Sequence, residues 1–168
     1  MFGDTYSELR LASYTSASTS PLLMASEFLV SHNIKKIKTS ELEFLLNLSN
    51  QLKWKPNAEL NKIKQPYMAV VVTDRAKNII WVNGYFETMT GYTRDEVLHR
   101  NPKFLQGKET DTLTLHSIRK KINGQKKFKG TLINYKKNGE EYRCNVDIQP
   151  IFNIEGIHTH YIAFETDR

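Results

Sequence analysis

The sequence predicts an α+β protein: a five-stranded antiparallel sheet with helices on one face, preceded by an N-terminal helical extension. Three observations predict it. Alternating β-rich segments occur in two groups, one near the middle of the chain and one at its end. Segments with helix caps lie between the two groups. Asn138-Gly139 and the stretch 153–156 are hairpin turn signals, which join the last three strands in antiparallel order.

The extension is predicted to cover residues 1–66. Its first 20 residues are rich in Ser and Thr and are expected to be mobile. Ser40 and Glu43 have the spacing of a capping box, which predicts that a new helix begins there. Three helices are therefore predicted, over residues 20–33, 40–54 and 57–64. The second has a broad leucine-rich surface that a lone helix cannot leave in water.

The domain is predicted to cover residues 67–168. Its strands are expected at residues 67–74, 78–83, 127–136, 140–152 and 157–166. Between the second and third strands, Asn83 is expected to cap one short helix, and Thr93 with Glu96 another. A longer helix over 111–124 ends at Asn123-Gly124.

Composition, charge and cysteine count argue against several classes of protein. The chain has 168 residues, a net charge of +6 and a single cysteine, Cys144, so it has no internal disulfide. No apolar run is long enough to span a bilayer, and the N-terminus lacks the pattern of a secretion signal. The basic residues are scattered without a nucleic-acid-binding motif, which favours a solvated face. We expect a cytoplasmic protein that contacts neither membrane nor nucleic acid.

Four stretches in order carry a family resemblance: "VVVTD", "WVNGYFETMTGYTRDEVL", "NPKFLQG" and "GTLINYKKNGEEY". Together they resemble a PAS domain, and most closely the LOV subgroup of flavin-binding blue-light sensors. The resemblance covers roughly residues 67–167. It implies the PAS fold and a ligand pocket between the sheet and its helices.

The resemblance also implies roles for eight positions. In the LOV subgroup the loop reads Asn-Cys-Arg-Phe-Leu-Gln-Gly, and its cysteine thiol adds to the excited flavin ring. Four flavin-binding positions keep the family residue: Asn101, Gln106, Arg119 and Asn134. Four depart from it: Pro102 in place of the cysteine, Lys103 in place of a phosphate-binding arginine, Cys144 in place of an asparagine and Glu165 in place of a glutamine. Without a thiol at position 102, the usual photo-adduct cannot form.

Strand alternation decides which side chain of "YRCNVDIQ" faces the pocket. Cys144 shares its face with apolar neighbours, whereas Asn145 shares the opposite face with charged residues. We therefore expect Cys144 to point into the pocket and Asn145 to point away.

The leading function is a PAS sensory module that binds a small ligand in this pocket. FMN or FAD is a candidate ligand, and it would be bound without adduct photochemistry. If neither is bound, we expect the domain to hold no cofactor. The alternative function is a ligand-free PAS module for protein association. We expect no enzyme and no metal site, because His158 and His160 are expected to form a solvated pair and no nucleophile stands beside a base.

Association is expected through the leucine-rich helix and the outward sheet face, since an apolar face must be covered. The cover is either the same chain's helix or a symmetric partner's, and we expect a homodimer; a separate output protein is a further candidate partner. The predicted interface residues are Leu42, Leu45, Leu46, Ile133, Tyr135, Ile162 and Phe164.

Overall fold

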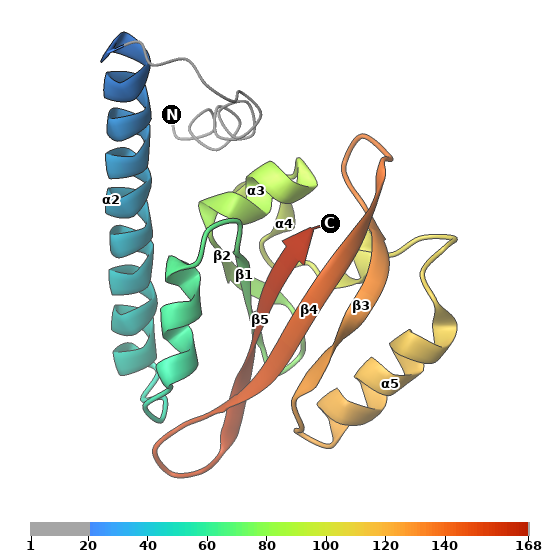
Figure 1. Cartoon of the computed structure of the whole chain (residues 1–168). Coiled ribbons are helices and arrows are strands. Elements are labelled where there is room, and N and C mark those ends of the chain that lie inside the picture. Colours follow the sequence, from blue (N-terminus) through green and yellow to red (C-terminus); the bar gives the residue numbers. More distant parts are fainter. Residues whose placement is uncertain (1–20, 168) are drawn as a thin grey trace.

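The computed structural model describes residues 21–167, with side chains from Glu27 onward (Figure 1). Its centre is a five-stranded antiparallel sheet of order β2-β1-β5-β4-β3. The strands are β1 (Ala69–Asp74), β2 (Ile79–Val82), β3 (Phe128–Tyr135), β4 (Glu141–Phe152) and β5 (His158–Asp167). The predicted antiparallel sheet is confirmed, with strand ends within two residues of expectation. Residues 1–20, expected to be mobile, lie outside the described residues.

Helical elements lie on both faces of this sheet (Figure 1). Those within the domain are α3 (Gly84–Thr90), α4 (Arg94–Val97), η2 (Pro102–Leu105) and α5 (Thr112–Asn123). They share one apolar core with one face of the sheet. The extension supplies α2 (Pro21–Gln51) and η1 (Ala58–Lys64), whose apolar side chains form a second core with the opposite face. None of the described helices is long and apolar enough to cross a membrane.

The extension differs from the prediction in one respect. The helices expected over 20–33 and 40–54 are a single α-helix of 31 residues, so the predicted capping box at Ser40 is wrong. Ser40 Oγ instead donates a hydrogen bond of 2.7 Å to the carbonyl of Ile37, one turn back in the helix. Nothing between residues 33 and 40 stops a helix, because the segment has neither Pro nor Gly and is rich in lysine.

The C-terminal half of α2 covers the outer sheet face of its own chain. Leu42 and Leu45 are buried against Ile162 and Phe164 of β5. Leu46, by contrast, keeps 44% of its surface exposed. Of the two alternatives left open by the sequence, the structure therefore shows intrachain cover for this face.

The remaining two predicted interface residues lie on the edge strand β3 and are half-buried. The Tyr135 hydroxyl accepts a hydrogen bond from the backbone N–H of Glu109 and donates one to Glu141, both at 3.0 Å. Thr110 Oγ1 donates to the carbonyl of Ile133 at 2.7 Å. These contacts, through the Tyr135 side chain and the Ile133 backbone, tie the loop after η2 to the sheet edge.

A buried asparagine joins β1 to α3. Asn83 Oδ1 accepts hydrogen bonds from the backbone N–H groups of Val70 at 2.8 Å and of Phe86 at 3.3 Å, the latter as the helix cap predicted for it. Its Nδ2 donates to the carbonyl of Met68 at 2.9 Å. Since buried backbone groups need partners, this side chain ties the start of β1 to the first turn of α3.

Candidate ligand-binding site

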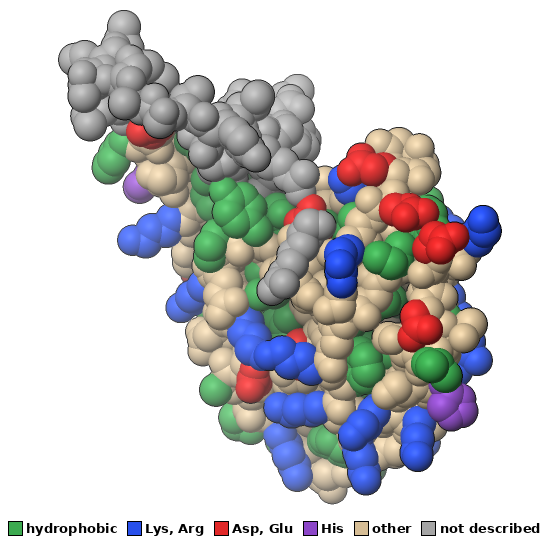
Figure 2. Space-filling view, turned by 45° about the vertical axis from the view of Figure 1, so that its right-hand side comes forward, with side chains coloured by type: hydrophobic (Ala, Val, Ile, Leu, Met, Phe, Trp, Pro, Cys, Tyr) green, Lys and Arg blue, Asp and Glu red, His purple; other side chains and the backbone are tan. Residues whose placement is uncertain are grey.

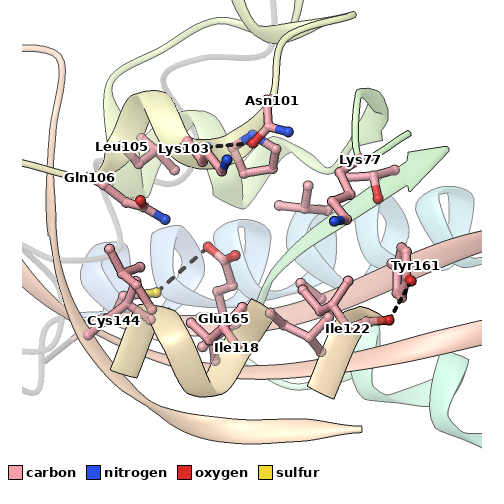
Figure 3. Close-up of a pocket in the computed structure, with 18 of the residues that line it drawn as sticks. Lys77, Asn101, Lys103, Leu105, Gln106, Ile118, Ile122, Cys144, Tyr161 and Glu165 are labelled. Carbon is pink, nitrogen blue, oxygen red and sulfur yellow. Dashed lines mark hydrogen bonds between the residues drawn. The ribbon is translucent and has the colours of Figure 1, made fainter. Parts of the chain in front are cut away.

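A cavity of about 250 Å³ lies between the sheet, η2 and α5 (Figure 3). Its walls are apolar side chains of β1, β3, β4, β5 and α5, with a small number of polar groups among them. A mainly apolar hollow with few polar groups is typical of a small-molecule site. All eight positions named by the resemblance line it: Asn101, Pro102, Lys103, Gln106, Arg119, Asn134, Cys144 and Glu165.

The η2 segment forms the roof of this cavity. Asn101 caps it, since its Oδ1 accepts a hydrogen bond of 3.2 Å from the backbone N–H of Lys103. Pro102 occupies the first turn, where its missing N–H costs nothing and its fixed φ suits the helix. The segment ends against the sheet edge at Gly107, where an added Cβ would lie 2.3 Å from the Tyr135 ring. The loop therefore forms a capped helical turn with a proline at the thiol position.

The sheet forms the floor. Asn134, Cys144 and Glu165 come from β3, β4 and β5 respectively. Asn134 pairs with Tyr142, two residues before Cys144, and Glu165 pairs with Val146, two residues after it. Asn145 points to the other face, where its Oδ1 accepts from Thr131 Oγ1 at 2.7 Å. The predicted orientation of Cys144 is therefore confirmed.

Glu165 is a buried carboxyl group whose one described side-chain partner is a thiol. Cys144 Sγ lies 3.7 Å from Glu165 Oε2 and can donate a weak hydrogen bond to it (Figure 3). Burial raises the pKa of Glu165 to about 7. Burial and the neighbouring carboxyl also raise the pKa of Cys144. At neutral pH the pair can therefore supply an O–H donor as well as acceptor oxygens, while the thiol stays protonated and unreactive.

Asn134 leaves a polar atom unpaired at the same floor. Its Oδ1 is buried and has no hydrogen bond of normal geometry among the described residues. Buried carbonyl oxygens are rarely left in this state, and each one calls for an explanation. The buried Tyr142 hydroxyl, which also lacks a hydrogen bond of normal geometry, interacts with the Asn134 side chain, and either this hydroxyl or a donor on a molecule in the cavity would satisfy the oxygen.

Three cations line the cavity: Lys77, Lys103 and Arg119. None forms an ion pair with a carboxylate in the part of the chain that the structure describes. Lys77 was not predicted; it belongs to the β1–β2 hairpin, between the motifs "VVVTD" and "WVNGYFETMTGYTRDEVL" and in neither of them. Figure 2, which brings the α5 side forward, shows Lys and Arg side chains gathered over the lower part of this face. Such a surface attracts anions.

The two histidines of β5 are not the solvated pair that the sequence predicted. His158 is buried, and its ring lies 4.4 Å from that of Tyr161, measured between centroids. His160 Nδ1 accepts a hydrogen bond of 3.2 Å from the indole of Trp54. Trp54 of the extension packs against His160, which is half-buried, while Phe152 and Tyr161 of the sheet pack against His158. Among the described residues no group of metal-binding side chains occurs.

The PAS domain family model matches residues 67–168 of the chain. The chain belongs to the PAS family. This PAS domain is 37% identical over 103 residues to a blue-light photoreceptor of Listeria innocua, covering 60% of this chain and 40% of that protein. It is 30% identical over 112 residues to a nitrogen fixation regulatory protein of Klebsiella oxytoca, covering 67% of this chain and 23% of that protein.

Solved structures of LOV domains are similar to this chain in fold. The LOV domain of a blue-light activated histidine kinase from Erythrobacter litoralis matches with a TM-score of 0.57 and 28% identity, over 61% of this chain and 96% of that domain. A light-oxygen-voltage domain described with a flavin analogue matches with a TM-score of 0.62 and 27% identity, over 67% of this chain and 85% of that one. The chain spans less than half the length of the curated relatives named above. It is a LOV-like PAS sensory module.

Proposed function

We propose that this PAS domain binds a planar heterocycle with an anionic tail, with FMN and FAD as the leading candidates, and that it signals without a cysteinyl bond to the ligand. One observation carries the proposal. The cavity presents the buried Asn134 oxygen and the protonatable Glu165 on its floor, and three cations that form no ion pair with a described carboxylate on its walls.

The floor suits the polar edge of a flavin ring. Such an edge has an N–H donor flanked by carbonyl acceptors. Asn134 offers an acceptor for the N–H and an amide donor for a carbonyl, and Gln106 offers the same pair of groups from the roof. Protonated Glu165 supplies a further donor. The apolar walls, including Val146, Leu132 and Ile118, would lie against the ring faces.

The tail of a flavin nucleotide is a phosphate, and Lys103 and Arg119 are cations in positions to meet it. The lysine gives up the two-pronged geometry of the family's arginine but keeps the charge. A flavin, when bound, supplies blue-light absorption and reversible electron transfer. The protein holds and orients it, and Glu165 can hold or release a proton beside it.

Adduct chemistry lies outside the proposal for two reasons. Pro102 has no nucleophile, and it lines the cavity at the position of the family cysteine. Cys144 is the single cysteine of the chain, and its burial beside Glu165 keeps it as a thiol. A light or redox response must therefore act through protonation and hydrogen bonding at Glu165 and Asn134.

Strand β5 supplies a route for the signal. Ala163 and Glu165 line the cavity, while the alternate residues Ile162 and Phe164 lie under α2. A change in the charge or hydrogen bonding of Glu165 shifts the same strand on which Leu45 packs. Hydrogen exchange over residues 40–51 should change when the ligand binds. Equal protection with and without ligand would count against this route.

A homodimer through α2 is the second part of the proposal. Toward its N-terminus the helix extends beyond its own domain, and Phe28 and Leu29 keep 69% and 60% of their surfaces exposed. Exposed apolar residues in one stretch of helix favour a second apolar surface as cover. Sedimentation should show a dimer for the wild type and a monomer for Phe28→Asp, whereas Lys36→Asp, an exposed control on the same helix, should stay dimeric. A monomeric wild type would contradict it.

The test of ligand binding is an absorption spectrum of the freshly purified protein, followed by mass spectrometry of whatever denaturation releases. We expect a blue absorption band and a released flavin. A colourless protein that releases nothing would support the ligand-free association module instead. A different released molecule would contradict the flavin assignment and name the ligand.

A further inference from the structure

Lys77 has an unusual backbone for a lysine. It lies in the turn between β1 and β2 with φ of +73°. Its N–H donates to the carbonyl of Asp74 at 3.0 Å, and the N–H of Asn78 donates to Asp74 Oδ1 at 2.8 Å. A left-handed conformation favours Gly or Asn and costs other residues free energy. The backbone conformation therefore favours Gly or Asn at this position. We take this as an indication that the lysine side chain has a role of its own.

The side chain of Lys77 reaches over one end of the cavity. Figure 3 shows it near Ile122 and Tyr161, with Gln106 and Cys144 toward the other end. The Lys77 Nζ donates to Asn123 Oδ1 at 3.2 Å, a neutral acceptor at the end of α5. Since an ammonium has three donors, this one bond leaves two for a ligand.

The neighbouring polar groups at that end are already used. The Tyr161 hydroxyl donates to the carbonyl of Ile122 at 2.9 Å. The one carboxylate that lines the cavity, Glu165, bonds Cys144 on the floor. A ligand group at this end therefore meets an ammonium whose charge no described carboxylate balances.

We propose that Lys77, with the end of α5, forms an anion subsite that selects phosphorylated ligands over their neutral analogues. The inference rests on the proposed function, and it adds Lys77 to Lys103 and Arg119 as a cation that meets the phosphate of a flavin nucleotide. Binding of an anion at this subsite would also affect the structure. An anion held there links the β1–β2 hairpin to α5, a helix none of whose residues is fully buried by the protein itself.

The test uses Lys77→Gly with FMN and riboflavin, two probes that differ only in a phosphate group. Glycine removes the ammonium and also relieves the left-handed backbone, so the variant should have an unchanged or higher Tm. Loss of a charge-assisted hydrogen bond should weaken FMN binding about tenfold. Riboflavin binding should stay within about twofold, and Lys77→Arg should keep most of the preference for FMN. Lys120→Ala, an exposed lysine of α5 that does not line the cavity, is the matched control.

Each other outcome overturns the inference in a distinct way. If Lys77→Gly weakens both flavins equally and lowers the Tm, the lysine merely anchors the end of α5. If FMN binding is unchanged, the phosphate lies elsewhere. If the wild type binds riboflavin and FMN but does not distinguish them, the subsite fails while the proposed function stands. If it binds neither, the proposed function fails and the subsite with it.

Discussion

Replacing Glu165 by glutamine tests the electrostatics of the cavity floor. The carboxyl group is buried with a thiol as its described side-chain partner, and its pKa is raised to about 7. Glu165→Gln keeps the size and an acceptor for the Cys144 thiol but removes the ionisation. In the ligand-free chain, the variant should therefore be more stable than the wild type at alkaline pH and similar to it in acid.

The magnitude follows from the shift in pKa. Between pH 4.5 and about 7 the folded chain keeps a proton that the unfolded chain releases. The free energy of unfolding of the wild type therefore falls as the pH rises through this window, and it is flat with respect to this group above it. At 1.36 kcal/mol for each pKa unit, the total loss is about 3 kcal/mol.

The assay is urea unfolding of both proteins at intervals from pH 4.5 to 8.5. The difference in free energy of unfolding should grow with pH and reach a plateau of about 3 kcal/mol in favour of Glu165→Gln above pH 7. Glu155→Gln, a change at an exposed turn, should leave stability within about 0.5 kcal/mol at every pH. A pH-independent difference between wild type and Glu165→Gln would refute the reasoning, because it would mean that the carboxyl does not titrate in this window.

Three further predictions concern stability in the same urea assay. Leu45→Ala, at a fully buried position under the sheet, should cost about 3 kcal/mol, whereas Leu46→Ala on the exposed side of α2 should cost under about 1 kcal/mol; equal costs would contradict the intrachain packing. Asn83→Ala should cost about 3 kcal/mol because it leaves the Val70 N–H and the Met68 carbonyl without their side-chain partner; a loss below about 1 kcal/mol would show that water replaces the side chain. Gly107→Ala should cost about 2 kcal/mol because its Cβ would lie 2.3 Å from the Tyr135 ring, and an unchanged stability would show that the ring can move aside.

The sequence predicted the domain well because its signals are local. Alternation, turn residues and caps specify β1 to β5 and the helices between them, and Thr93 with Glu96 forms the predicted capping box. The same kind of signal failed at Ser40. A capping box marks a possible helix start, but it cannot stop an incoming helix when the preceding residues include neither Pro nor Gly.

Part of the candidate site was also predicted from local sequence signals. Family motifs and strand alternation identify Asn134, Cys144 and Glu165 as neighbours, and the structure places them on one cavity wall. Lys77 could not be found in this way, because its approach depends on the twist of the β1–β2 turn and on where α5 ends. The partial burial of His160 likewise depends on Trp54, which lies 106 residues away in the extension.

The most direct test of the central claim compares the wild type with Pro102→Cys after both are loaded with FMN and illuminated with blue light. We predict that the wild type holds the flavin through gel filtration and keeps its absorption band in the light. Pro102→Cys should lose the band reversibly, since its new thiol would face the ring from the roof. A wild type that takes up no flavin would contradict the account, and so would a Pro102→Cys variant that binds FMN and does not respond to light.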